Sequence, residues 1–181
     1  LYQVEVLAFH EGVPGHHLQR SLAIERTDRP SWLRQHGSTA SSEGWALYAE
    51  KLGVEYGWFE DEYSKIGYLN SEMLRAVRLV LDTGIHFKRW TRQQCLVFMQ
   101  ENLGWASNAS INRYAVWPGQ ACAYKIGELK ILELREKAKT RLGKRFKLKE
   151  FHKAILRYGS VPLKILEEIV DQYIIETSNG N

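Results

Sequence analysis

The stretch His10-Glu11-Gly12-Val13-Pro14-Gly15-His16-His17 holds three histidines around a proline-glycine pair, and it determines how the first part of the chain folds. In an unbroken helix each residue turns by about 100° and rises by about 1.5 Å. His16 would then point away from the face of His10, and His17 would share that face about two turns further on. Pro14 removes a backbone donor and clashes with the preceding turn, and Gly15 permits unusual dihedral angles. The sequence therefore predicts a helix that breaks at 13–15, and such a break can return His16 to the side of His10.

The chemistry of this octapeptide is close to that of zinc hydrolases. In their commonest signature two histidine ligands lie one helical turn apart, and the glutamate between them acts as general base. The second histidine would fall at position 14 here, where the chain has a proline. Because Zn–N bonds are only about 2.0–2.1 Å long, a regular helix would serve neither His16 nor His17 well. On the octapeptide alone, a zinc site and unrelated surface histidines near a helix end both remain open.

Composition indicates one folded unit. The chain has 181 residues, of which 44% are hydrophobic and 12% aromatic, so we expect a single domain over 1–181 with a real core. Cys95 and Cys122 lack metal-ligand spacing and are expected to be free thiols, although a disulfide stays possible. No apolar stretch approaches 18 residues, so we expect no membrane span. The chain starts at Leu1, so an upstream signal or lipid anchor would not be visible, and an exported or periplasmic and a cytoplasmic location both stay open.

Net charge is only +4, and the densest basic stretch is 137–149. Such a run can meet nucleic acid or anionic lipid. No stacking-aromatic pattern or nucleic-acid motif accompanies it, so we interpret it as a solvated helix end and loop. The sequence predicts no nucleic-acid partner.

Hydrophobic periodicity predicts an all-α fold, a multi-helix array. Thr91 is expected to cap a short helix that ends at about 102, and Ser41 or Ser42 to cap the helix that follows the loop 37–42. Only about 110–117 is expected to be extended. The remaining helices are predicted at about 2–13, 15–26, 43–56, 60–91, 118–142, 148–158 and 162–177.

Further blocks of sequence follow the octapeptide in a fixed order. They are Glu43-Gly44-Trp45-Ala46-Leu47-Tyr48-Ala49-Glu50, Arg78-Leu79-Val80-Leu81-Asp82-Thr83-Gly84-Ile85-His86, Arg113-Tyr114, Pro118-Gly119-Gln120-Ala121, Tyr124-Lys125-Ile126-Gly127, Phe151-His152 and Gly159-Ser160-Val161-Pro162-Leu163. Together they resemble the bacterial DUF885 family, a group related to the gluzincin-type metallopeptidases. The resemblance covers essentially the whole chain. It implies the catalytic helical half of a gluzincin-like enzyme, built around a broken zinc-motif helix, at the C-terminal end of a longer protein. The N-terminal remainder would then complete the active-site cleft as a partner.

This resemblance implies one Zn²⁺ ion. His10 and His16 are the expected histidine ligands, with His17 as the alternative to His16. A catalytic zinc takes three protein ligands and keeps one open position. Gluzincin-like enzymes supply the third ligand as a glutamate from a helix downstream, which points to Glu43, with Glu50 as its competitor on the same helix face.

The same resemblance assigns the catalytic groups. Glu11 is the candidate general base, which would take a proton from a water activated by zinc. Tyr114 and Tyr124 are candidates for stabilising the negative charge that develops on the carbonyl oxygen. His152 and His36 are expected to be structural or exposed.

Five further polar residues complete the candidate site. Asp82 and His86 lie four apart on one helix face, so they can hydrogen-bond each other, or Asp82 can orient a zinc-bound histidine. Arg78 can hold Asp82 or bind a substrate carboxylate. Arg113 can clamp a C-terminal carboxylate, and Gln120 can line the cleft.

Two classes of function follow from the sequence. The first is a zinc-dependent hydrolase of peptide or related amide bonds, whose partner is a peptide or small amide substrate. A hydrolase of non-peptide amides is a variant of this hypothesis. The second is a metal-free binding or structural protein that has kept the fold without the reaction.

Overall fold

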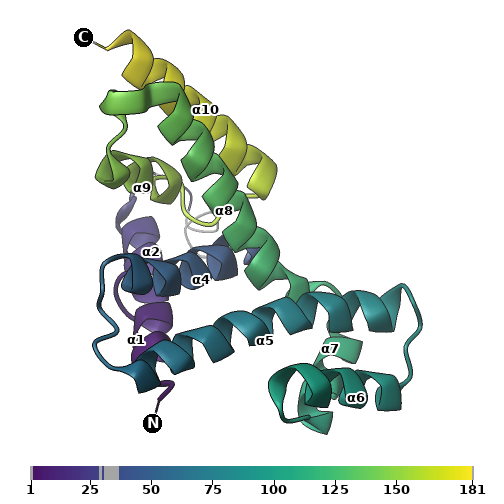
Figure 1. The fold of residues 1–181 in the computed structure, drawn as a ribbon. Coiled ribbons are helices and arrows are strands. Elements are labelled where there is room, and N and C mark those ends of the chain that lie inside the picture. The colour runs from purple at the N-terminus through teal and green to yellow at the C-terminus, as the bar shows by residue number, and fades with distance from the viewer. Residues whose placement is uncertain (1, 29, 31–36, 181) are drawn as a thin grey trace.

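Helices joined by short connections form the described part of the chain (Figure 1). The computed structural model describes residues 2–28, 30 and 37–180, and these ranges contain no strand. The predicted all-α class is therefore confirmed. The elements are α1 (Val4–Glu11), α2 (His16–Glu25), α4 (Thr39–Glu55), α5 (Glu62–His86), α6 (Arg92–Leu103), α7 (Asn108–Val116), α8 (Gln120–Leu142), the 3₁₀ turn η1 (Gly143–Arg145), α9 (Leu148–Leu156) and α10 (Leu163–Asn179).

The pair α4 and α8 forms the centre of the array. The two helices approach closely at Gly44 and Gly127, where a Cβ on Gly44 would overlap the backbone of Gly127 and a Cβ on Gly127 would overlap the carbonyl oxygen of Ala40. Helices α1 and α2 pack on α4, while α5 packs on the N-terminal and α10 on the C-terminal part of α8 (Figure 1). This arrangement brings α1, α2, α4, α5 and α8 to one region of the molecule.

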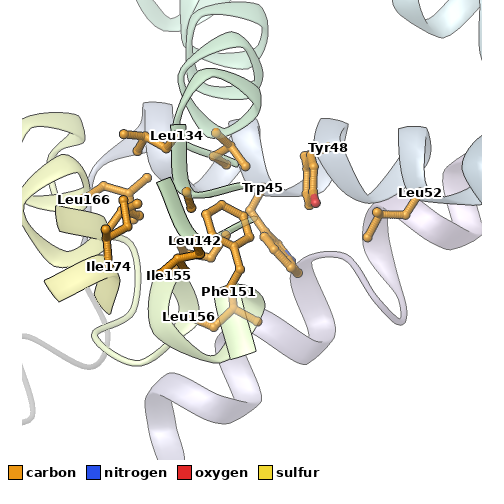
Figure 2. Packing of buried hydrophobic residues seen from close by; sticks show 13 residues of the cluster. Trp45, Tyr48, Leu52, Leu134, Leu142, Phe151, Ile155, Leu156, Leu166 and Ile174 are labelled. Carbon is orange, nitrogen blue, oxygen red and sulfur yellow. The ribbon is translucent and has the colours of Figure 1, made fainter. Parts of the chain in front are cut away.

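The larger hydrophobic core lies where α4, α8, α9 and α10 meet. Figure 2 shows Trp45 and Tyr48 of α4 among side chains of the other three helices. The hydroxyl of Tyr48 and Nε2 of His152 form a hydrogen bond of 2.8 Å, and the ring of His152 packs edge-on against Trp45. Burial, helped by the charge of Arg135, lowers the pKa of His152 to about 4, so this histidine is a neutral structural residue, as predicted. The core residues are Trp45, Tyr48, Leu52, Ile131, Leu134, Ala138, Leu142, Phe151, Ile155, Leu156, Leu166, Val170 and Ile174.

A second core joins α5, α6, α7 and the start of α8. Its buried residues include Val77 and Leu81 of α5, Cys95 of α6 and Tyr114 of α7. Cys95 is buried and Cys122 half-buried, and both are free thiols, the first of the two alternatives that the sequence left open. This second core fixes the position of α7 relative to α5.

Two local predictions are wrong. Residues 110–117 are not extended but lie mostly in α7, because Ser107 caps this helix by accepting the backbone N–H of Ser110 and the helix buries Ile111. Helix α4 begins at Thr39 with Ser38 at the N-cap, not at Ser41 or Ser42. The hydroxyl of Ser41 instead donates to the carbonyl oxygen of Val161, in the connection before α10, and that of Ser42 faces a side chain of α2.

The remaining predictions concern helix ends and surface. Thr91 caps α6 through a reciprocal capping box with Gln94, as predicted. In the basic run, Lys137 pairs with Asp171 of α10 at 2.6 Å. No helix within the described ranges combines the length and apolar character needed to cross a bilayer. His36 lies outside the described residues.

Candidate metal centre

The helix break predicted at the octapeptide is confirmed. Helix α1 ends at Glu11, the Val13–Pro14 peptide bond is cis, and α2 begins at His16 with Gly15 at its N-cap. A Cβ on Gly15 would overlap the carbonyl oxygen of His10, so only glycine fits this return of the chain. The indole N–H of Trp45 donates to the carbonyl oxygen of Pro14 at 2.8 Å and ties the break to α4. The rings of His10 and His16 consequently lie 4.9 Å apart, edge to face.

Three of the predicted ligands come together at this break. One donor atom each of His10, His16 and Glu43 lie within 4.8 Å of one another. Oε2 of Glu43 is 3.3 Å from Nε2 of His16 and 3.7 Å from Nε2 of His10. Ligand atoms at tetrahedral positions around a zinc ion, about 2.1 Å from it, lie about 3.4 Å apart. The spacing of the donors and their two-histidine, one-carboxylate chemistry therefore fit a zinc ion. His17, the alternative ligand, is exposed and is not part of this cluster.

Glu50 lies on the other side of the His10 ring. Its carboxylate is fully buried and accepts the Nδ1–H of His10 at 2.6 Å. Ser71 donates to the second carboxylate oxygen, and Arg75 lies 3.4 Å from the first. A carboxylate on Nδ1 fixes the ring so that Nε2 faces Glu43, which is the outer-sphere role that orients metal-binding histidines. Glu50 is thus placed to orient His10 and not to share a metal ion with it.

The electrostatics of the cluster favour a cation. Burial alone would raise the pKa of Glu43, but hydrogen bonds from His10 and His16 outweigh it and lower the pKa to about 2. Burial would lower the pKa of His10, and the hydrogen bonds to Glu43 and Glu50 instead raise it. The Nδ1 atom of His16 is buried without a partner in the described residues. The cluster therefore holds an ionised carboxylate against two imidazoles, where a metal ion would take the place of their protons.

The candidate base and one candidate tyrosine lie beside these groups. Glu11 directly follows His10 as the last residue of α1, and its side chain is exposed. Tyr124 of α8 stacks near His10, with ring centroids 6.4 Å apart and an interplanar angle of 21°. The amide of Gln120 donates to the hydroxyl oxygen of Tyr124 at 3.2 Å. Since that oxygen already accepts a hydrogen bond, its own proton is available to another acceptor.

Tyr114 is linked to Tyr124 through Arg78. Its hydroxyl accepts from Nε of Arg78 at 3.0 Å. The guanidinium of Arg78 also stands 4.9 Å from the centroid of the Tyr124 ring. Arg113 is exposed and donates to the side chain of Gln120 at 3.3 Å, so it supports the residue that contacts Tyr124.

Asp82 and His86 do not take the positions expected for them. The carboxylate of Asp82 accepts the backbone N–H of Gly119 at 3.0 and 3.2 Å, at the start of α8. His86 bonds to the carbonyl oxygen of Tyr114 at 2.9 Å through Nε2. Within the described residues they form no hydrogen bond with each other, and Asp82 does not orient a histidine of the cluster. Gly119 is the N-cap of α8, so its backbone N–H has no acceptor within the helix and Asp82 satisfies it, while Glu50 occupies the Nδ1 of His10.

Sequence reasoning missed Ser71 and Arg75, which hold Glu50. Both lie on α5, where Ser71, Arg75, Arg78 and Asp82 are spaced by four, three and four residues. This spacing places them on one helix face, which points to α4 and α8. This row of polar residues at helical spacing was the signal that the sequence offered.

The comparisons with known proteins place the chain in a family. The profile described as "Bacterial protein of unknown function (DUF885)" matches residues 1–170. A solved structure of a "putative lipoprotein" from Colwellia psychrerythraea is similar to 97% of this chain, at 45% identity and a TM-score of 0.93. Another, of a "putative lipoprotein of unknown function" from Shewanella oneidensis, is similar to 93% of it, at 28% identity and a TM-score of 0.83. The chain spans 31% of the length of each. No protein with a curated description matches it. The chain therefore belongs to the DUF885 family of bacterial proteins.

Proposed function

We propose that this chain carries the zinc site of a hydrolase that cleaves peptide or related amide bonds, related to the gluzincin-type metallopeptidases. The observation that carries the proposal is the convergence of His10, His16 and Glu43, with carboxylate-to-nitrogen separations of 3.3 and 3.7 Å. Two histidines and one glutamate are a ligand set of catalytic zinc sites. Because the chain spans 31% of its structural relatives, the activity is proposed for the longer protein that contains it.

Each residue around the ligands then has a task. A bound zinc ion supplies Lewis-acid polarisation and lowers the pKa of water toward neutrality. Glu11, exposed beside His10, takes the proton of the attacking water and passes it to the departing amine. Tyr124, with its proton free to donate, stabilises the negative charge on the carbonyl oxygen, and its stacking near His10 favours it over Tyr114. Glu50 keeps the Nε2 of His10 directed at the metal position.

Zinc content and turnover of the full-length protein test this proposal. We expect near-stoichiometric zinc by elemental analysis, lost on His16→Ala. We expect Glu11→Gln to retain zinc and to lower kcat by about a hundredfold or more, the typical contribution of a general base. Glu25→Gln is the matched control, since Glu25 is an exposed glutamate at the end of α2, as Glu11 is at the end of α1.

Substrates for this test are mixed peptides, with new termini detected by mass spectrometry. The absence of near-stoichiometric metal, even after zinc loading, would refute the zinc site and leave a metal-free binding or structural role. Unchanged turnover in Glu11→Gln would refute the assignment of the base.

A further inference from the structure

Arg78 is a half-buried cation for which the described residues provide no carboxylate. Its Nε donates to the hydroxyl of Tyr114 at 3.0 Å, and its guanidinium lies 4.9 Å from the ring centroid of Tyr124 and 5.8 Å from that of Tyr114. Arg75, one turn earlier on α5, pairs with the carboxylate of Glu50. Throughout the described ranges no acidic side chain pairs with Arg78, and its two terminal nitrogens form no hydrogen bond.

This arrangement leaves the planar end of Arg78 ready for a ligand. The two tyrosine rings and the bond at Nε hold the guanidinium in one orientation. A guanidinium held at Nε presents Nη1 and Nη2 side by side, which matches the two oxygens of a carboxylate. A half-buried positive charge without a partner is costly, so an anion that completes the pair is stabilised there.

The distance between Arg78 and the candidate metal site determines how far the anionic group of a substrate lies from the cleaved bond. The Tyr124 ring contacts both His10, at 6.4 Å between centroids, and the guanidinium of Arg78, at 4.9 Å. The guanidinium is therefore at most about 11 Å from the His10 ring. Consider a substrate whose cleaved carbonyl lies at the metal position. One further residue, about 3.8 Å long, leads to its C-terminal carboxylate, and the contact between this carboxylate and the guanidinium covers the rest of the distance. Peptides that extend several residues past the cleaved bond would place their terminal carboxylate beyond Arg78.

We propose that Arg78 binds the C-terminal carboxylate of the substrate, so that this site removes single residues from the C-terminus of peptides or acylated amino acids. This inference rests on the proposed hydrolase function and adds its substrate class. In the reaction the last C–N bond breaks, the carbonyl carbon gains the oxygen of water, and the released amino acid takes up the proton through its amine. Arg78 is a binding residue here, and the chemical step stays with Glu11 and Tyr124.

A binding experiment tests the carboxylate site without turnover. The zinc-loaded full-length protein with Glu11→Gln is titrated by calorimetry with Nα-acetyl tripeptides of apolar, acidic and basic C-terminal residues, each as the free acid and as the C-terminal amide. We expect the free acids to bind about tenfold more tightly or better, the usual effect of a charged hydrogen-bonded pair. Adding Arg78→Met should reduce this preference to about twofold or less, and Arg78→Lys should leave an intermediate preference because it keeps the charge without the planar pair of donors.

The control variant is Arg92→Met, which replaces an exposed arginine on α6 that donates to the side chain of Asn108, and it should retain the full preference. Equal binding of acids and amides by the protein with Arg78 intact would overturn the inference, and so would binding of neither. The comparison of acids and amides on the protein with Arg78 intact does not depend on how the Arg78 and Arg92 variants fold.

Turnover separates this inference from the function on which it rests. Release of single C-terminal residues from free acids, with amidated peptides left intact, supports both. Cleavage of internal bonds, or of amides at the same rate, would overturn the carboxylate site while the hydrolase function stands. If neither peptides nor acylated amino acids are cleaved, the hydrolase proposal fails, and the ratio of acid to amide affinity still decides whether Arg78 binds a carboxylate.

Discussion

Replacement of Glu50 by glutamine is the most specific single test of the candidate metal site, because Glu50 contacts His10 and is not one of the three proposed ligands. Its fully buried carboxylate accepts from His10 at 2.6 Å and also contacts Ser71 and Arg75. Glutamine has the same shape and can still accept from His10 through its carbonyl oxygen. It removes the negative charge that makes the Nε2 of His10 a better ligand.

The size of the effect follows from this one bond. Hydrogen bonds to charged groups contribute about 1.5–3 kcal/mol and neutral ones about 0.5–1.5 kcal/mol, so the difference of about 1–1.5 kcal/mol corresponds to a zinc affinity about tenfold weaker. The same substitution leaves Arg75, whose side chain is 13% exposed, without its carboxylate. Loss of one partner of a buried pair costs about 3–5 kcal/mol, so we also expect a lower Tm.

A second variant separates these two effects. Glu50→Gln combined with Arg75→Met removes the unpaired charge and should recover part of the Tm, while zinc affinity stays weak. Glu55→Gln is the control, since Glu55 lies on the same helix and pairs with Arg135 at 2.8 Å away from the cluster. Zinc affinity is measured on full-length protein by competition with a chelator of known affinity, and Tm by thermal unfolding. A Kd for Glu50→Gln within twofold of the unaltered protein would refute the orienting role of Glu50.

Two further predictions concern the break and the core. Gly15→Ala forces a Cβ into the carbonyl oxygen of His10, so we expect a loss of about 1–3 kcal/mol in the free energy of unfolding and weaker zinc binding; a variant with both unchanged would show that the tight return is not needed. In the unfolded chain His152 takes up a proton below about pH 6.5, whereas in the folded protein its pKa is lowered to about 4. The free energy of unfolding therefore falls as pH decreases from 6.5 to 4. The loss is up to about 3 kcal/mol, and it should shrink in His152→Gln, which can still accept from Tyr48. Denaturant titrations at pH 7 and about pH 4 check this, and equal pH dependence of the two proteins would contradict it.

The parts of the fold that were predicted correctly depend on local chemistry. The break at 13–15 follows from the missing donor of Pro14 and the freedom of Gly15, and the cap at Thr91 from the glutamine three residues later. The errors come from tertiary contacts. Residues 110–117 carry few helix formers, yet α7 forms because Ile111 and Tyr114 are buried against α5 and α6. Propensity is a weak prior when one helical face is buried in this way.

In the candidate site, too, the sequence identified residues through local spacing and could not show the tertiary contacts that separate their roles. The sequence identified Glu43 and Glu50 as competitors, because both lie on one face of α4 two turns apart. What separates them is the packing of α1 on α4, which turns Nε2 of His10 to Glu43 and Nδ1 to Glu50. Asp82 was misassigned for a similar reason: the backbone N–H that it satisfies belongs to Gly119, far along the chain, and helical spacing on α5 alone does not show it.

In the proposed function, the charged groups around Tyr124 favour one direction of the substrate. Glu43, His10 and His16 form the candidate metal site, and the ring of His10 lies 6.4 Å from the ring of Tyr124. The guanidinium of Arg78 lies 4.9 Å from the ring centroid of Tyr124, and its terminal nitrogens form no hydrogen bond among the described residues. Tyr124 therefore contacts both His10 and Arg78, and its hydroxyl proton is free to donate. A substrate that bound in the reverse direction would lose the pairing of its C-terminal carboxylate with Arg78. In the proposed reaction, a carbonyl at the metal position and a carboxylate at Arg78 would be bound at the same time, and this pairing would favour cleavage next to a free C-terminus.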